Sequence, residues 1–273
     1  MKKVLFASTA LVMVAGAAAA DVTLSGSANM GLFYNGTNTV VKNEIDIDVV
    51  GSVETDGGLS LGASVDLDAE SNNSAHTTGT GPSDPEVFLS YEGLTLTVGD
   101  VGEASDQGGL ADVGFDGIGI DNVAEIGAFG SHDVNVAYSF GDIAASVSID
   151  SDNANNDWGI GFSTSFDSVS IAVGFGETAG ANQTTATVGF SSGAFGANIF
   201  YVDNSTNTGQ GVDVSYTTGD VTITAVYADS NVAGVPSAYG LGFAYDLGGA
   251  TLAGGIGEAA NTTVADLGIS FSF

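Results

Sequence analysis

Carboxylates dominate the residues of this chain that could do chemistry. The 273 residues include 33 Asp and Glu but only three Lys and no Arg. Two segments carry acids at alternate positions, which are Asp46, Asp48 and Glu54 in the first and Asp66, Asp68 and Glu70 in the second. Carboxylates without neighbouring bases attract cations, whereas phosphate recognition depends on Lys and Arg. The composition therefore excludes a nucleic-acid partner.

The other side chains give little support for catalysis. The two histidines, His76 and His132, both fall in expected loops, and the chain has no cysteine. A zinc site normally needs more His and Cys ligands than these, and no G-x-S-x-G nucleophile elbow occurs. We therefore expect no enzyme activity and no required cofactor. Without disulfides, an exported form of the chain must fold without covalent cross-links.

The N-terminus has the features of a secretory signal peptide. Lys2 and Lys3 precede an apolar stretch over 4–15, and small residues at 17–20 provide a cleavage site. We expect residues 1–20 to be removed and residues 21–273 to form one domain. That mature chain has 33 acids and Lys42 as its single base, for a net charge of about −32. Its mean hydropathy is nevertheless positive, at +0.27 for the full chain.

A two-residue alternation of apolar and small or polar side chains covers most of the mature chain. This period is typical of half-buried β-strands. Sixteen segments show it, namely 22–34, 45–54, 59–70, 87–92, 94–100, 134–140, 143–150, 158–166, 169–176, 185–191, 195–202, 212–216, 221–228, 238–246, 250–257 and 264–273.

The connections between these segments alternate in length. Short turn sequences occupy 55–58, 92–93, 141–142, 167–168, 192–194, 218–220 and 247–249, and longer polar ones occupy 35–43, 71–85, 151–157, 177–184, 203–210 and 230–236. This alternation places all the short turns at one end of the sheet. One stretch, 101–132, loses the two-residue period for about 30 residues, and loops of that length are usually functional or disordered.

The residue types on the two strand faces favour a membrane barrel over a β-sandwich. The polar face is rich in Ser, Thr, Gly, Asn and Asp, unlike an ordinary solvent-exposed sheet. Aromatic residues lie near strand ends, as interfacial girdles would require, at Tyr34, Tyr91, Tyr138, Phe140, Phe166, Tyr216, Tyr227 and Tyr245. In lipid such a sheet must close. The terminal LGISFSF would then be the closing strand, paired with the first strand, with Leu267, Ile269 and Phe271 facing lipid.

Several segments resemble the general porins of alphaproteobacteria, the Rhodobacter type. The resemblance lies in DVTLSGSANMGLFYNG (21–36), TDGGLSLGASVDLDAE (55–70), VFLSYEGLTLTVGDVGEASD (87–106) and AYDLGGATLAGGIGEAANTTVADLGISFSF (244–273). It covers most of the mature chain and is weakest in the middle strands.

The resemblance implies an all-β fold, a 16-stranded antiparallel transmembrane β-barrel with a long third loop folded into the pore. It also implies a homotrimer in the outer membrane of a Gram-negative bacterium, with residues 71–85 reaching a neighbouring subunit. In this family acids of the third loop narrow the channel. The matching residues here are Glu103, Asp106, Asp112, Asp116, Asp121 and Glu125.

The chain departs from the family pattern on the opposite wall of the channel. The family places basic residues there, but this sequence offers Asp46, Asp48, Asp66 and Asp68 at inward positions, with Lys42 in an expected loop. A constriction that is negative on both sides should favour cations. Crowded carboxylates can also recruit a metal ion, so calcium at Asp106, Asp112 and Asp116 is an expectation.

The function expected from these features is a water-filled outer-membrane channel for passive diffusion of small hydrophilic solutes, with a preference for cations. Two alternatives remain open at this point. One is a secreted acidic calcium-binding β-protein, either an adhesin or a β-roll, since GFDGIGIDN (114–122) resembles one β-roll repeat. The other is a membrane-anchoring barrel whose pore the long loop blocks.

Overall fold

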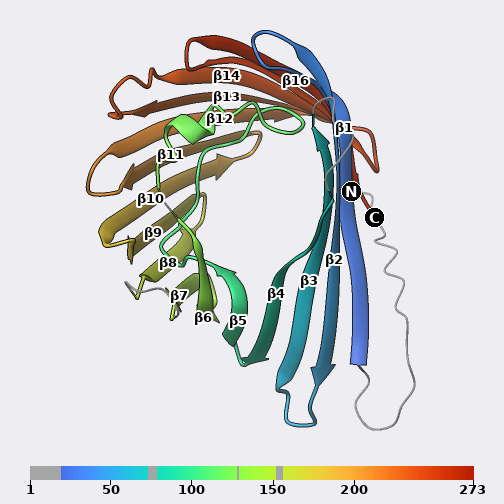
Figure 1. Ribbon diagram of the computed structural model, residues 1–273, viewed down its shortest axis with the longest axis vertical. Coiled ribbons are helices and arrows are strands. Elements are labelled where there is room, and N and C mark those ends of the chain that lie inside the picture. Colours follow the sequence, from blue (N-terminus) through green and yellow to red (C-terminus); the bar gives the residue numbers. More distant parts are fainter. Residues whose placement is uncertain (1–19, 73–78, 128, 152–155) are drawn as a thin grey trace.

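The chain forms a closed barrel of antiparallel strands (Figure 1). The computed structural model describes residues 20–72, 79–127, 129–151 and 156–273, apart from the side chains of 71–72 and 79–82. The expected signal peptide therefore lies outside the described residues, except for Ala20. The predicted all-β fold with sixteen strands is confirmed.

The sixteen strands follow the segments of two-residue alternation. Their bounds are β1 Ala20–Tyr34, β2 Thr39–Glu54, β3 Ser60–Asn72, β4 Gly79–Tyr91, β5 Leu94–Gly102, β6 Ser131–Phe140, β7 Ile143–Ile149, β8 Trp158–Phe166, β9 Val169–Thr178, β10 Ala181–Ser192, β11 Phe195–Asp203, β12 Thr208–Thr218, β13 Val221–Ser230, β14 Ala238–Asp246, β15 Thr251–Ala259 and β16 Thr262–Ser272. One 3₁₀ turn, η1 Asp121–Val123, lies between β5 and β6.

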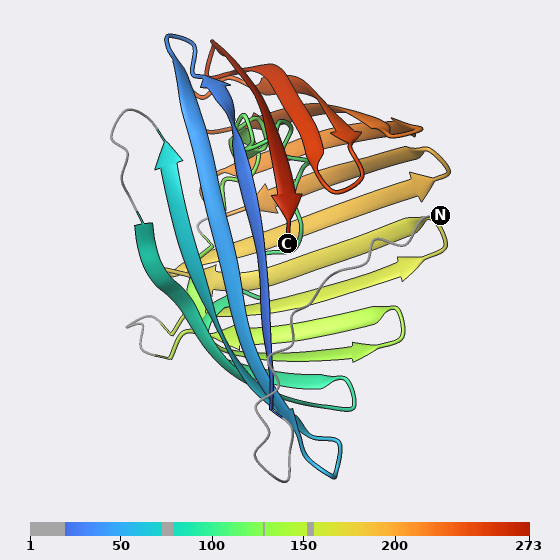
Figure 2. The ribbon, with the colours of Figure 1, turned by 90° about the vertical axis from the view of Figure 1, so that its right-hand side faces the viewer.

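Every strand pairs with its neighbours in sequence, and β1 pairs with β16 to close the ring. The predicted role of the last segment as closing strand is confirmed. Two backbone hydrogen bonds extend this pairing beyond β16, from Gly26 N to Phe273 O at 3.0 Å and from Phe273 N to Gly26 O at 2.9 Å. Figure 2 shows the C-terminal end of the chain beside β1. Closure pairs the first strand with the last, so the sheet has no free edge strand of the kind that an open sheet exposes.

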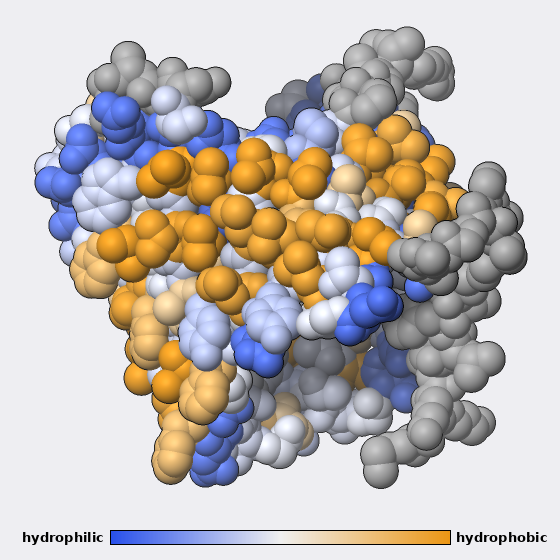
Figure 3. Space-filling model, turned by 90° about the horizontal axis from the view of Figure 1, so that it is seen from below, coloured by the Kyte–Doolittle hydropathy of each residue, from blue (hydrophilic) through white to orange (hydrophobic). Residues whose placement is uncertain are grey.

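The outer wall is apolar, as expected for contact with lipid. Outward side chains such as Phe140, Phe166 and Ile199 are 70%, 84% and 60% exposed. Of the strand-end aromatics, Tyr91, Tyr138, Phe140, Phe166, Tyr216, Tyr227 and Tyr245 are all exposed. Apolar side chains cover much of the face seen from below in Figure 3. A water-soluble protein rarely leaves so large an apolar surface uncovered.

Four expected loops are shorter than the sequence suggested, and one of them, 203–210, is reduced to residues 204–207 between β11 and β12. Residues 177–184 form a tight hairpin with only Ala179 and Gly180 between strands, and both have positive φ, of 53° and 80°. Such values suit the two-residue turns of hairpins. Strand β2 begins at Thr39, so the expected loop 35–43 is largely strand, and β4 takes up the end of 71–85.

The described residues contain no helix that is long and apolar enough to cross a membrane.

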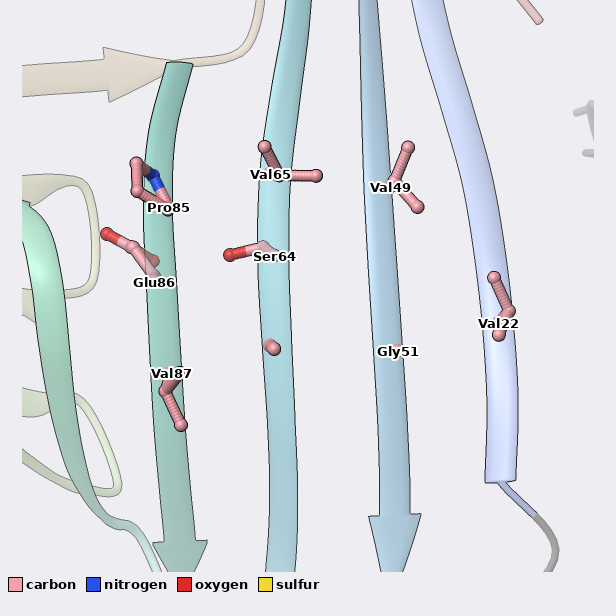
Figure 4. A pocket seen from close by; sticks show the side chains of 9 residues that line it. Val22, Val49, Gly51, Ser64, Val65, Pro85, Glu86 and Val87 are labelled. Atoms are coloured by element: carbon pink, nitrogen blue, oxygen red, sulfur yellow. The ribbon is translucent and has the colours of Figure 1, made fainter. Parts of the chain in front are cut away.

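A hollow of about 450 Å³ lies on β1–β4, where small residues leave room between valines (Figure 4). Its lining includes Val22, Val49, Val65 and Val87, one from each of the four strands, with Gly51 between them. These side chains belong to the outward-facing set, and a Cβ added at Gly51 would meet no atom within 4 Å.

Candidate functional site: the long loop inside the barrel

The long loop, residues 103–130, runs inside the ring of strands rather than away from it (Figure 1). Its backbone and side chains contact inward-facing residues of β7 to β16 and of β1 and β2. The loop was recognised in the sequence from its missing strand period, and its position here agrees with the fold that the resemblance implied.

The root of the long loop is a buried polar cluster around Glu103. The carboxylate of Glu103 accepts hydrogen bonds from the hydroxyls of Ser105 and Thr178, the latter at 2.8 Å. His132 Nε2 lies 3.9 Å from Glu103 Oε2, and both side chains are almost fully buried. Ser148 Oγ lies 2.7 Å from His132 Nδ1 and accepts the Ala104 N–H, also at 2.7 Å.

This root resembles a Ser–His–Glu arrangement, but substrate cannot reach it. Ser148 is only 1% exposed, and its hydroxyl already interacts with the loop backbone. A nucleophile must be accessible to the bond it attacks. His132, expected in a loop, is instead the second residue of β6, and its contacts make it a support for the long loop.

The middle of the long loop is fixed to the wall by hydroxyl and carboxylate groups that face inward. Thr185 Oγ1 donates to the carbonyl of Ser105 at 2.6 Å and accepts the Gln107 N–H at 3.2 Å. Farther along, the Ala111 N–H donates to Asp213 Oδ2 at 3.1 Å. These bonds satisfy backbone groups that enter a partly buried environment, as a loop inside a barrel requires.

An apolar cluster holds the next part of the long loop against β11, β13 and β14. Its loop members are Leu110, Val113, Ile118, Ile120 and Ala124, and its wall members include Phe200, Val202, Val226, Ala228 and Ala238. Burial of such side chains stabilises by roughly 25 cal/mol per Å² of apolar surface. The loop is therefore attached by its own hydrophobic core as well as by hydrogen bonds.

The loop tip, residues 114–117, lies over the seam between β1 and β16. The backbone N–H groups of Phe115 and Asp116 both donate to Asp266 Oδ2, at 2.9 and 3.2 Å. The ring of Phe115 contacts Gly31 on β1 and Gly268 on β16, where a Cβ would come within 2.6 and 2.4 Å of ring atoms. Asp116 forms a salt bridge with Lys42 on β2.

The long loop packs against glycines on the inner face of the barrel wall. A Cβ added to any of them would meet a loop atom within 3.1 Å, a backbone atom in five cases and a side-chain atom in seven. These glycines are Gly159, Gly161, Gly174, Gly176, Gly209, Gly211, Gly240, Gly242, Gly255, Gly257 and Gly268, together with Gly31. The small residues of the polar face thus make room for the loop, a role that the strand pattern alone did not reveal.

The six loop acids expected at a constriction are in different environments. Asp106 and Asp112 are exposed, whereas Glu103 is buried in the root and Asp121 is only 8% exposed. Asp116 is paired with Lys42, and Glu125 Oε1 accepts the Leu110 N–H at 2.8 Å. Two of the six carboxylates are thus exposed, three make contacts that hold the loop, and Asp121 is buried.

Four carboxylates of the long loop have a raised pKa and so are harder to ionise than isolated carboxylates. Burial raises the pKa of Asp106, Asp121 and Glu125. For Asp112 the pKa is raised to about 6, first because the enclosed loop removes part of its hydration and then because Asp121 and Asp266 repel its charge. This part of the loop therefore changes its charge close to neutral pH.

The four aspartates that the sequence placed on the barrel wall, Asp46, Asp48, Asp66 and Asp68, form pairs across β2 and β3. Asp46 is opposite Asp68, and Asp48 is opposite Asp66, so all four lie on one face of the sheet, as the predicted parity requires. All four side chains are half-buried. Serine hydroxyls contact two of them, Ser25 with Asp48 at 3.2 Å and Ser83 with Asp68 at 3.1 Å.

The expected position of Lys42 was wrong. It lies on β2 rather than in a loop, and its ammonium group is inside the barrel. Sequence reasoning also missed the loop-binding roles of Asp213 and Asp266. The one available signal was parity, because both acids alternate with outward apolar residues in their strands.

No group of three or more potential ligands among the described residues is arranged to hold a metal ion. Calcium at Asp106, Asp112 and Asp116 stays a prediction. The pairing of Asp116 with Lys42 leaves two of these three carboxylates free of a cationic partner.

Comparison with known proteins agrees with this architecture. A family model described as Gram-negative porin matches residues 7–267. A porin of Fuscovulum blasticum is 27% identical over 293 aligned residues, which cover 93% of this chain and all of that protein.

Solved structures show the same fold. A multiple mutant of Rh. blastica porin superposes with a TM-score of 0.81 at 23% identity, over 92% of this chain and all of the other. A second mutant of that porin gives a TM-score of 0.80 at 24% identity over the same shares. Family, fold and outer-membrane localisation are thus confirmed, and the chain belongs to the family of Gram-negative porins.

Proposed function

We propose that this porin is a diffusion channel for small hydrophilic solutes that prefers cations. The observation that carries the proposal is the charge inside the barrel. Exposed Asp106 and Asp112 lie on the long loop, and four aspartates lie on β2 and β3. Lys42, the single Lys or Arg of residues 21–273, is paired with Asp116.

Rings of acidic side chains favour cations because they replace part of the hydration energy that a cation loses in a narrow passage. Anions meet no compensating positive charge from Lys or Arg along the mature chain apart from the paired Lys42. No cofactor is needed for such passive transport. The secreted soluble alternative does not fit an outer wall with so many exposed apolar side chains.

The test is the reversal potential of the purified protein in a planar bilayer under a potassium chloride gradient. We expect the sign of the reversal potential to indicate a preference for cations. This preference should weaken at 1 M salt, because the Debye length falls to about 3 Å. The double variant Asp106→Asn/Asp112→Asn should roughly halve the preference, because it removes the exposed loop charges.

A matched control removes two acids from exposed short turns, Asp56→Asn/Asp220→Asn, and should leave the reversal potential unchanged. A preference for anions in the unmodified protein would refute the proposal. Absence of any conductance would support the alternative of a barrel blocked by its loop.

We also propose that the protein is a homotrimer, which the family resemblance supports. Part of the segment expected to reach a neighbouring subunit, 73–78 within 71–85, lies outside the described residues. The hollow over β1–β4 provides a place on the outer wall where another subunit could pack.

A further inference from the structure

Lys42 is the single Lys or Arg after the expected signal peptide, and the structure places it inside the barrel. Its Nζ forms the salt bridge with Asp116 at the loop tip, and it lies 4.6 Å from the centre of the Phe33 ring. The two charged side chains are 25% and 18% exposed. A partly buried pair of this kind is screened less by salt than a surface pair.

Asp116 lies among further groups from three strands. Asn29 on β1 donates to Asp116 Oδ1 at 3.5 Å and to Glu44 on β2 at 2.9 Å. The backbone of Asp116 donates to Asp266 on β16. Apart from Lys42, the charged side chains in this set are therefore carboxylates.

The charge balance at the loop tip depends on Lys42. Without its ammonium group, Asp116 would be a half-buried carboxylate close to Glu44 and Asp266, with no opposite charge from Lys or Arg elsewhere in the mature chain. Removing one partner of a buried pair is costly because the other charge remains unpaired. The loop tip could reduce this cost by moving away from the wall, toward water in the channel.

We propose that Lys42 is a positioning residue that holds the loop tip on the β1–β16 seam and so keeps the channel in one conducting state. The seam is the shorter of the two pairings of β1, which matches β16 over Ser27–Tyr34 and β2 over Ala20–Tyr34. This inference rests on the channel function proposed above, because a moving loop tip is detected through the current.

Single-channel recordings of the full mature protein test the role of Lys42. The variant Lys42→Gln should interrupt the open current about fivefold more often than the unmodified protein, as expected for loss of one partly buried ion pair. Lys42→Arg, which keeps the charge, should behave as the unmodified protein does. The double variant Lys42→Gln/Asp116→Asn should show fewer interruptions of the open current than Lys42→Gln alone, because it removes the unpaired carboxylate.

The control Asn38→Asp makes the same change in net charge in the exposed β1–β2 loop and should not alter the current. Migration on gels before and after heating reports whether each barrel has folded. If Lys42→Gln does not fold, Lys42→Met replaces it, because methionine keeps an apolar stem over Phe33. The inference would be overturned if the uncharged Lys42 variant interrupted the current no more often than the unmodified protein. It would also be overturned if Lys42→Gln and the double variant showed the same frequency of interruptions.

Failure of the proposed function would give a different result. It would appear in the unmodified protein, as a missing cation preference or missing conductance, whatever the Lys42 variants do. Loss of stability alone would change the heating behaviour without the recovery expected in the double variant.

Discussion

At the scale of single residues, acids of one type have opposite roles according to where the fold places them. Asp213 and Asp266 accept loop N–H groups and so stabilise the buried backbone. Asp106 and Asp112 are exposed and remain available to ions. A carboxylate on this chain therefore stabilises the fold where it accepts backbone N–H groups, and under the proposed function it acts on ions where it is exposed to water.

The pKa of Asp112 predicts a pH dependence of ion selectivity. Because this pKa is about 6 in the folded protein instead of 3.8, the side chain gains a proton as the pH falls from 7 to 5. The cation preference should therefore decline over this range, above the pH at which ordinary carboxylates titrate near 4. Reversal potentials at pH 7.5, 6 and 5 measure the decline.

The same pKa gives the sign of the stability effect. A raised pKa means that ionised Asp112 destabilises the folded protein above pH 6, and that this penalty disappears as the pH falls toward 4.

The variant Asp112→Asn tests the assignment of the selectivity change to Asp112. It should flatten the change in selectivity between pH 7.5 and 5. If the variant keeps the full change, another group is responsible.

At the scale of elements, the long loop and the strands beneath it fit each other. Strand glycines allow the loop backbone to approach the wall, and the apolar cluster and inward hydroxyls then attach it. Glycine weakens a strand by roughly 0.5–1 kcal/mol relative to alanine. The barrel accepts this cost where the loop would otherwise collide with a side chain.

Gly209→Ala tests this relation between wall and loop. The added Cβ would come within 1.8 Å of the Ala124 carbonyl oxygen and 3.0 Å of Val202, so the loop must move away from the wall. Overpacking of this kind costs about 1–3 kcal/mol. We expect a lower unfolding temperature and a smaller single-channel conductance, because the loop is pushed into the channel.

Gly102→Ala provides the control for Gly209→Ala, since a Cβ at Gly102 meets no atom within 4 Å. It should leave the conductance unchanged. Equal conductance in Gly209→Ala would show that the loop does not limit the passage of ions.

At the scale of the whole molecule, the barrel was predictable from the sequence because a period of two determines which side chains share a face. The strand count, the closing pair β1–β16 and the long loop all follow from that period. The attachment of the loop was not predictable. The bond from Ala111 to Asp213 joins residues 102 positions apart, and that from Asp116 to Asp266 joins residues 150 apart.

The position of Lys42 also could not be predicted from the two-residue period, because it lies near the end of a strand. Residues 39–44 mix polar side chains with valine, so the alternation was too weak to indicate a strand, although β2 begins at Thr39. Pairing with the full length of β1 overrides this weak local signal.

The assembly of the whole molecule can be tested at the outer hollow. Gly51→Trp would place an indole ring in the hollow between Val22, Val49 and Val87, at a position where the added Cβ meets no atom within 4 Å. If another subunit packs there, the indole ring blocks it, and the trimer proposed above should dissociate at lower detergent concentration. If only lipid tails fill the hollow, they adapt to the ring and the trimer persists. Sedimentation in detergent, with Ala186→Trp on the outward face of β10 as the control, distinguishes the two results. Equal sedimentation of both variants and the unmodified protein would place the subunit contact elsewhere on the barrel.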